Sequence, residues 1–93
     1  MRRRARVDAN HADIVATLRA CGWYVHDTSR LGGGFPDLVC ARAGKVILVE
    51  VKDGTKPLSK QILTQTEVEV HDRFTVRGVF VRIITSTKQA MSL

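Results

Sequence analysis

Residues 34–52 read GFPDLVCARAGKVILVEVK and predict the centre of the fold. Residues 37–42 and 46–52 are rich in apolar and β-branched side chains, which favours two strands. Between them, residues 43–44 are Ala-Gly and suit a two-residue turn, so the two strands would form an antiparallel hairpin.

The charged residues of this hairpin need a chemical reason. If residues 43–44 form the turn, Asp37 lies directly opposite Glu50, and like charges in opposed positions destabilise a sheet. Lys52 follows Glu50 by two residues and points to the same face. A hard divalent cation, Mg²⁺ or Mn²⁺, would relieve the repulsion, because such ions bind carboxylate oxygens and leave positions for water and phosphate. Alternatively, Glu50 only pairs with Lys52 along an edge strand and the hairpin only builds the sheet.

The rest of the chain predicts an alternation of helices and strands. Asn10 and Asp13 suit the first turn of a helix over residues 10–21, and Thr64 with Glu67 forms a T-x-x-E capping box at the start of another helix. We also expect strands over residues 23–28 and 78–85 and a short helix from Ser86.

Composition and charge restrict the function classes. Ninety-three residues suit one small domain, and 15 Lys and Arg against 9 Asp and Glu give a net charge of +6. This balance favours a polyanionic partner, nucleic acid first, although small soluble proteins are often basic. No apolar run is long enough for a membrane span, and residues 32–34 lack the Lys-Ser/Thr ending of a nucleotide-binding loop. The basic start has no apolar core after it, which indicates a cytoplasmic protein.

Several motifs together resemble a known family. GGFPDLV followed by VEVKDG resembles the PD-(D/E)XK nuclease signature, and the segments DANHADIV, LTQTEVEVHDRF and VRIITSTKQAM make the chain similar to the small stand-alone VRR-NUC nucleases of bacteria and phages. The resemblance implies an α/β domain with a restriction-endonuclease-like core, in which helices flank a central mixed β-sheet. This domain would span residues 8–93, after a basic arm over residues 1–7.

The resemblance also implies roles for individual residues. Asp37 and Glu50 would bind Mg²⁺ or Mn²⁺ together with the backbone carbonyl of Val51, and Lys52 would be the catalytic lysine. Asp13 stands where the family usually has a glutamate and is a further candidate ligand, or a helix cap. Glu67 stands where the family often has a glutamine, so it would alter phosphate contacts or metal number, or cap its helix.

The implied function is metal-dependent endonucleolytic cleavage of DNA phosphodiesters by a homodimer, on branched DNA such as four-way junctions. A non-catalytic DNA-binding module and a subunit that cuts only with a partner protein are the rival interpretations. Binding that is unaffected by a chelator would favour the module. The candidate DNA contacts are basic residues and one loop glycine: Arg2, Arg3, Arg4, Arg6, Arg30, Gly33, Lys56 and Lys60.

Overall fold

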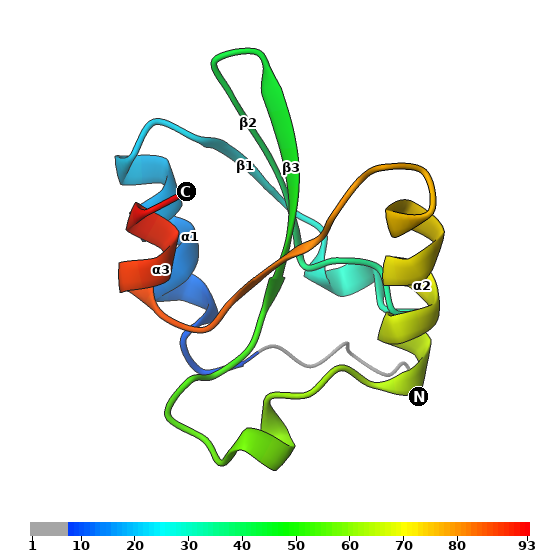
Figure 1. The fold of residues 1–93 in the computed structure, drawn as a ribbon. Helices are drawn as coiled ribbons and strands as arrows, with labels where there is room; N and C mark the ends of the chain where they lie inside the picture. The colour runs from blue at the N-terminus through cyan, green and yellow to red at the C-terminus, as the bar shows by residue number, and fades with distance from the viewer. Residues whose placement is uncertain (1–7) are drawn as a thin grey trace.

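The computed structural model describes residues 8–93, which form a four-stranded sheet flanked by helices (Figure 1). In chain order the elements are α1 (His11–Ala20), β1 (Tyr24–Asp27), η1 (Ser29–Leu31), β2 (Leu38–Arg42), β3 (Lys45–Val51), η2 (Leu58–Lys60), α2 (Gln65–Thr75), β4 (Arg82–Ile84) and α3 (Thr87–Met91). The expected basic arm over residues 1–7 lies outside the described residues, and so do Arg2, Arg3, Arg4 and Arg6.

The sheet is mixed, as the sequence predicted. Its order is β1-β2-β3-β4, with the first two pairs antiparallel and β3 parallel to β4. Arg42 pairs with Lys45, so the predicted hairpin register is confirmed. Ala43 and Gly44 have φ values of 51° and 79°, and positive φ at both central residues matches the twist of a two-residue hairpin.

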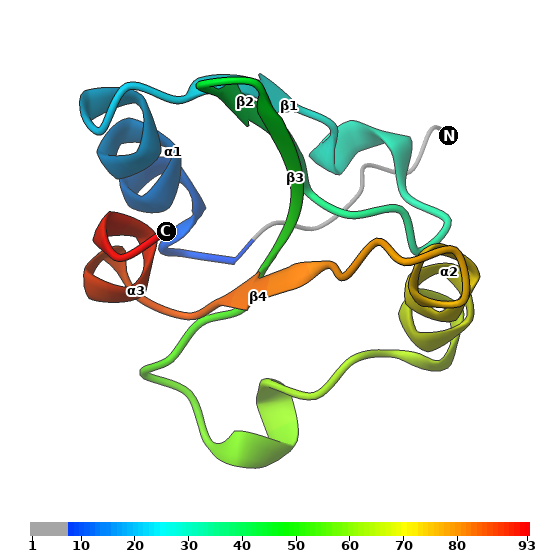
Figure 2. The same ribbon diagram turned by 45° about the horizontal axis from the view of Figure 1, so that its top comes forward.

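The hydrophobic core lies between the sheet and two helices. In both views α1 and α3 lie side by side against one face of the sheet (Figures 1 and 2). Alternate strand residues supply this face, because successive side chains of a strand point to opposite faces. The buried cluster comprises Ile14, Val15, Leu18, Trp23, Val25, Leu38, Cys40, Val49, Val51, Ile84 and Ala90.

Helix α2 stands on the other side of the sheet (Figure 2). Its N-terminal turn is closed by the predicted capping box, in which Thr64 accepts from the backbone N–H of Glu67 and Glu67 accepts from that of Thr64. The glycine-rich loop before β2 lies against this turn, since a Cβ added to Gly34 would lie 2.5 Å from the Thr66 carbonyl oxygen. The loop and the start of α2 are therefore in close contact.

One prediction about local structure is wrong. The strand expected over residues 78–85 is reduced to Arg82–Ile84, because β4 pairs only with Val49–Val51 and the residues before it have no strand beside them. Asn10 is the N-cap residue of α1, as predicted, although its side chain makes no capping hydrogen bond. Within residues 8–93, no helix combines the length and the apolar character needed to cross a membrane.

Candidate active site

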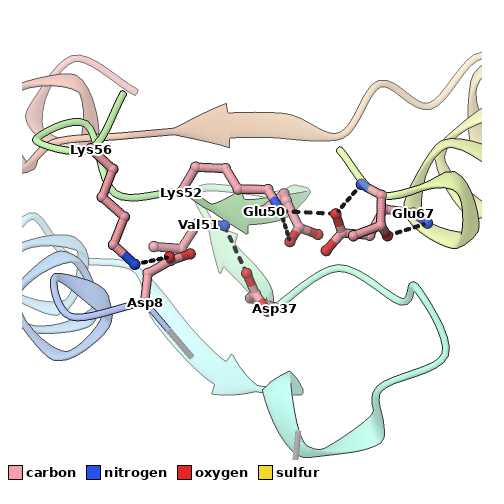
Figure 3. Close-up of a pocket in the computed structure, with 8 residues that line it drawn as sticks. Asp8, Asp37, Glu50, Val51, Lys52, Lys56 and Glu67 are labelled. Atoms are coloured by element: carbon pink, nitrogen blue, oxygen red, sulfur yellow. Dashed lines mark hydrogen bonds and ion pairs between the residues drawn. The ribbon is translucent and has the colours of Figure 1, made fainter. Parts of the chain in front are cut away.

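A pocket of about 360 Å³ opens where β3 ends, beside the start of α2 (Figure 3). Most of its lining comes from charged side chains, which are costly to bury unless they are paired or bind an ion. The lining residues are Asp8, Asp37, Glu50, Val51, Lys52, Lys56, Thr64 and Glu67. The hairpin thus brings the predicted Asp37, Glu50, Val51 and Lys52 into one place.

The two carboxylates of the hairpin are held by the sheet itself. Asp37 directly precedes β2, and its Oδ2 accepts a hydrogen bond of 2.8 Å from the backbone N–H of Val51. Glu50 lies within β3 and is only 2% exposed. Since Leu38 pairs with Val49, the register continues to Asp37 opposite Glu50, as the sequence predicted.

Negative charge in this pocket is poorly balanced by the protein. Burial raises the pKa of Asp37, against the opposing effect of the Val51 N–H. Burial, the charge of Asp37 and the neighbouring Glu67 raise the pKa of Glu50 to about 10. Both carboxylates therefore resist ionisation in this pocket, and a cation bound there would favour their charged forms.

Lys52 crosses the pocket to the capping residue of α2. Its Nζ donates a hydrogen bond of 2.8 Å to Glu67 Oε1 and lies 3.9 Å from Glu50 Oε2 (Figure 3). Burial acts to lower the pKa of Lys52, but the hydrogen bond and charge of Glu67 outweigh it, and the pKa is raised. Lys52 is therefore a charged ammonium at neutral pH, and its hydrogen bond to Glu67 sets its orientation.

Glu67 thus has two partners at once. Its Oε1 accepts from Lys52 Nζ and from the backbone N–H of Thr64, at 2.8 Å and 2.9 Å. Burial opposes ionisation of Glu67, yet the hydrogen bonds from Lys52 and Thr64 lower its pKa. The helix-capping interpretation is confirmed, and the same carboxylate also contacts the predicted catalytic lysine.

His71 reaches the site from α2, which sequence analysis missed. Its Nε2 lies 3.4 Å from Glu50 Oε1, and the side chain is buried. Burial lowers the pKa of His71, so the ring is neutral near Glu50 at neutral pH. His71 follows Glu67 by four residues, and this spacing could have predicted its place at the site, because residues so spaced share a helix face.

The start of the described chain adds two further residues that were missed. Asp8 lines the pocket, and its Oδ1 lies 3.8 Å from Lys56 Nζ. Asn10 Nδ2 donates hydrogen bonds of 3.1 Å to the carbonyl oxygens of Lys52 and Thr85. Asn10 therefore ties the beginning of α1 to the chain segment that carries the lysine.

The structure does not bring Asp13 to the pocket. Asp13 is exposed on α1 and is absent from the pocket lining, while Ile14, Val15 and Leu18 form the buried face of that helix. The carboxylate that this end of the chain contributes is Asp8, five residues earlier. Both aspartates lie close together in the sequence, and the path of the chain into α1 decides which of them lines the pocket.

The candidate DNA contacts within residues 8–93 lie on different elements. Lys56 lines it, Arg30 lies exposed in η1, and Lys60 lies exposed in η2. Gly33 is exposed and lines a different cavity, next to Phe35. Of these residues, only Lys56 is within the carboxylate pocket.

The donor set, carboxylate and carbonyl oxygens, fits Mg²⁺ or Mn²⁺ better than an ion that prefers histidine or cysteine ligands. Within residues 8–93, no three His, Cys, Asp or Glu side chains form a group that could hold an ion by themselves. Asp37 and Glu50 would therefore share an ion with the Val51 carbonyl, water and substrate. Mg²⁺ suits this arrangement because it keeps several waters and uses only one or two protein carboxylates.

Comparison with known proteins agrees with this fold. One solved structure, described as a VRR_NUC domain, has 30% sequence identity and a TM-score of 0.66, with 92% of this chain and 95% of that chain covered. No family model and no curated protein matches the sequence. The mixed sheet with flanking helices has the restriction-endonuclease-like fold, and the similarity to a VRR_NUC domain indicates a nuclease domain. The chain belongs to the VRR-NUC family.

Proposed function

We propose that the protein is a DNA endonuclease that depends on Mg²⁺ or Mn²⁺ and acts as a homodimer on branched DNA such as four-way junctions. One observation carries the proposal: Asp37, Glu50 and Lys52 line a single pocket at the end of β3. A protein that only binds DNA would gain nothing from placing the buried Glu50 and the half-buried Asp37 where phosphate approaches.

The residues of the pocket divide the chemical work. Asp37, Glu50 and the Val51 carbonyl would hold the ion, which when bound supplies a Lewis acid for the phosphate and lowers the pKa of water. The Lys52 ammonium stabilises the negative charge that develops on the phosphate oxygens. Glu67 keeps this ammonium protonated and oriented by its hydrogen bond of 2.8 Å.

Two active sites would serve a substrate with two strands to cut, and an apolar patch supports the homodimer. Val46, Phe80 and Ile83 are 67%, 66% and 44% exposed, on β3, before β4 and on β4. Val46 and Phe80 line a shallow hollow of about 240 Å³ together with Val79. Large apolar side chains gathered on one surface are typical of an interface between subunits.

Cleavage of labelled DNA tests this proposal. Four-way junction, flap, single-stranded and linear duplex substrates are incubated with the protein in Mg²⁺, Mn²⁺ or EDTA. We expect cutting with either metal, none in EDTA, the fastest rate on the junction, and loss of cutting in Asp37→Ala. Binding without cutting under every metal condition would refute the proposal and favour the binding module or the partner-dependent subunit.

A further inference from the structure

A second cavity, of about 430 Å³, lies between the glycine-rich loop and the C-terminal half of α2. Unlike the carboxylate pocket, its surface is largely apolar. It is lined by Gly33, Phe35, Val70, Arg73, Phe74 and Arg77. We call this cavity the aromatic slot.

Two phenylalanines give the aromatic slot flat walls. The rings of Phe35 and Phe74 meet edge to face, with centroids 6.1 Å apart and planes at 72°. Both side chains are half-buried, so each ring keeps part of its surface open. Aromatic faces of this kind stack on nucleobases with little regard for sequence, because every base has a π-face.

Two arginines make the rim of the aromatic slot basic. Arg73 lies in the last turn of α2 and Arg77 lies just after the helix ends, and both side chains are exposed. Arg77 Nη1 donates a hydrogen bond of 2.7 Å to the Arg73 carbonyl oxygen, which draws its side chain back along the helix. An apolar floor with guanidinium groups at the rim complements a base joined to phosphate.

The two chain segments that form the aromatic slot also carry residues of the active site. Phe35 precedes Asp37 by two residues, and Glu67 and Phe74 lie seven residues apart on α2, about 10 Å along a helix. This spacing equals about three steps of a stacked DNA strand, or fewer of an extended one. The close approach of Gly34 to Thr66 fixes the loop against the helix between the two sites.

We propose that the aromatic slot binds an unpaired nucleobase of the strand that is cut, a few nucleotides from the scissile phosphate. This inference rests on the proposed nuclease function and defines its substrate class: DNA with unpaired nucleotides beside the cleavage site. A base inside an intact duplex must first be unstacked and unpaired, which costs free energy. The aromatic slot therefore favours flaps and open junction centres over plain duplex.

A fluorescent base measures occupancy of the aromatic slot directly. Flap DNA with 2-aminopurine at successive unpaired positions is titrated with the full-length Lys52→Ala protein, so that no cleavage occurs. We expect a saturable fluorescence change at one or two positions near the branch. In this background, Phe74→Leu should abolish the change and weaken flap binding about tenfold, the scale of one lost stacking contact.

Two further variants keep the result interpretable. Arg73→Ala alters an exposed side chain and leaves the fold intact, and it should also weaken flap binding. Tyr24→Leu removes an exposed aromatic side chain from β1, outside the aromatic slot, and should leave the fluorescence change in place. An unchanged signal in both Phe74→Leu and Arg73→Ala would overturn the inference. A change of oligomeric state in Phe74→Leu would also overturn it, because the aromatic slot would then be a subunit contact.

Failure of the inference differs from failure of the proposed function. DNA cutting by the wild-type protein without a 2-aminopurine signal at any position would refute the aromatic slot alone. A signal that disappears in Phe74→Leu, with no cutting in any metal, would refute the nuclease and leave a binding module that captures unpaired bases.

Discussion

At the level of single residues, the site contains two carboxyl groups whose negative charge is not neutralised by the surrounding sheet. Asp37 and Glu50 are opposed across the hairpin, and the pKa of each is raised by burial. The nearest ammonium, Lys52, makes its short hydrogen bond to Glu67 and not to either of them. The metal-free protein therefore carries a cost in stability that a cation would remove.

This cost gives stability a definite dependence on pH. The pKa of Glu50 is about 10 in the folded protein and about 4.5 when unfolded, so between these values the folded state binds more protons. The free energy of unfolding must therefore fall as pH rises through that window. Denaturant titration in EDTA from about pH 5 to about pH 9 should show this fall, and Mg²⁺ should restore stability.

Glu50→Gln should remove this dependence, because an amide does not titrate. In EDTA near neutral pH we expect the variant to be about 1 to 3 kcal/mol more stable than wild type, with a flatter pH profile and no response to Mg²⁺. Glu69→Gln, on the exposed surface of α2, is the matched control and should behave as wild type. A wild-type stability that rises with pH in EDTA would contradict this account of the pocket.

Substitutions of Glu67 can separate its role as the cap of α2 from its role as the partner of Lys52. Glu67→Gln keeps a side chain that can close the capping box, whereas Glu67→Ala removes both the cap and the partner of Lys52. We expect Glu67→Ala to lose about 1 kcal/mol of stability and to cut DNA about tenfold more slowly. Thermal unfolding and single-turnover cleavage measure the two effects. Equal rates for Glu67→Ala and wild type would show that Glu67 is only a cap.

At the scale of elements, α2 and the glycine-rich loop must approach closely for the site to form. Gly34 has a φ of 84° and lies where a Cβ would be 2.5 Å from the Thr66 carbonyl oxygen. The contact sets the position of the helix that carries both Glu67 and His71. The absence of a side chain at Gly34 therefore lets α2 come close enough for Glu67 to orient Lys52.

Gly34→Ala should therefore destabilise the protein and slow cleavage together. Gly32→Ala is the matched control, since Gly32 has a φ of 62° but no heavy atom within 4 Å of an added Cβ. Each alanine carries a positive-φ penalty of about 1–3 kcal/mol, and Gly34→Ala should lose at least about 1 kcal/mol more by displacing α2. Equal melting temperatures and cleavage rates of the two variants would contradict this role.

The sequence predicted the elements that are specified locally and missed contacts made across the chain. The hairpin register followed from residues 43–44, and the cap of α2 followed from Thr64 and Glu67, because both are short-range signals. The length of β4 could not be read, since its partner is a parallel strand. Asp8 and His71 reach the pocket only through the path of the chain and the packing of α2, which no local pattern records.

At the scale of the whole molecule, the two faces of the sheet have different tasks. One face packs against α1 and α3 and holds the core, whereas the other carries the carboxylates and an exposed apolar patch around Val46, Phe80 and Ile83.

A charge within this patch should separate a homodimer. We expect Phe80→Lys to be monomeric and Met91→Lys, on α3, to remain dimeric, measured by light scattering across a range of protein concentration. A wild-type protein that is monomeric throughout would refute the homodimer.

Single-turnover cleavage of the preferred DNA substrate in Mg²⁺ tests whether the pocket at the end of β3 is the catalytic centre, by comparing wild type with Lys52→Ala and with Lys88→Ala on α3. We expect Lys52→Ala to lose about a hundredfold or more in rate while it still binds DNA, and Lys88→Ala to cut as wild type does. Cleavage by Lys52→Ala at the wild-type rate would show that the catalytic centre lies elsewhere.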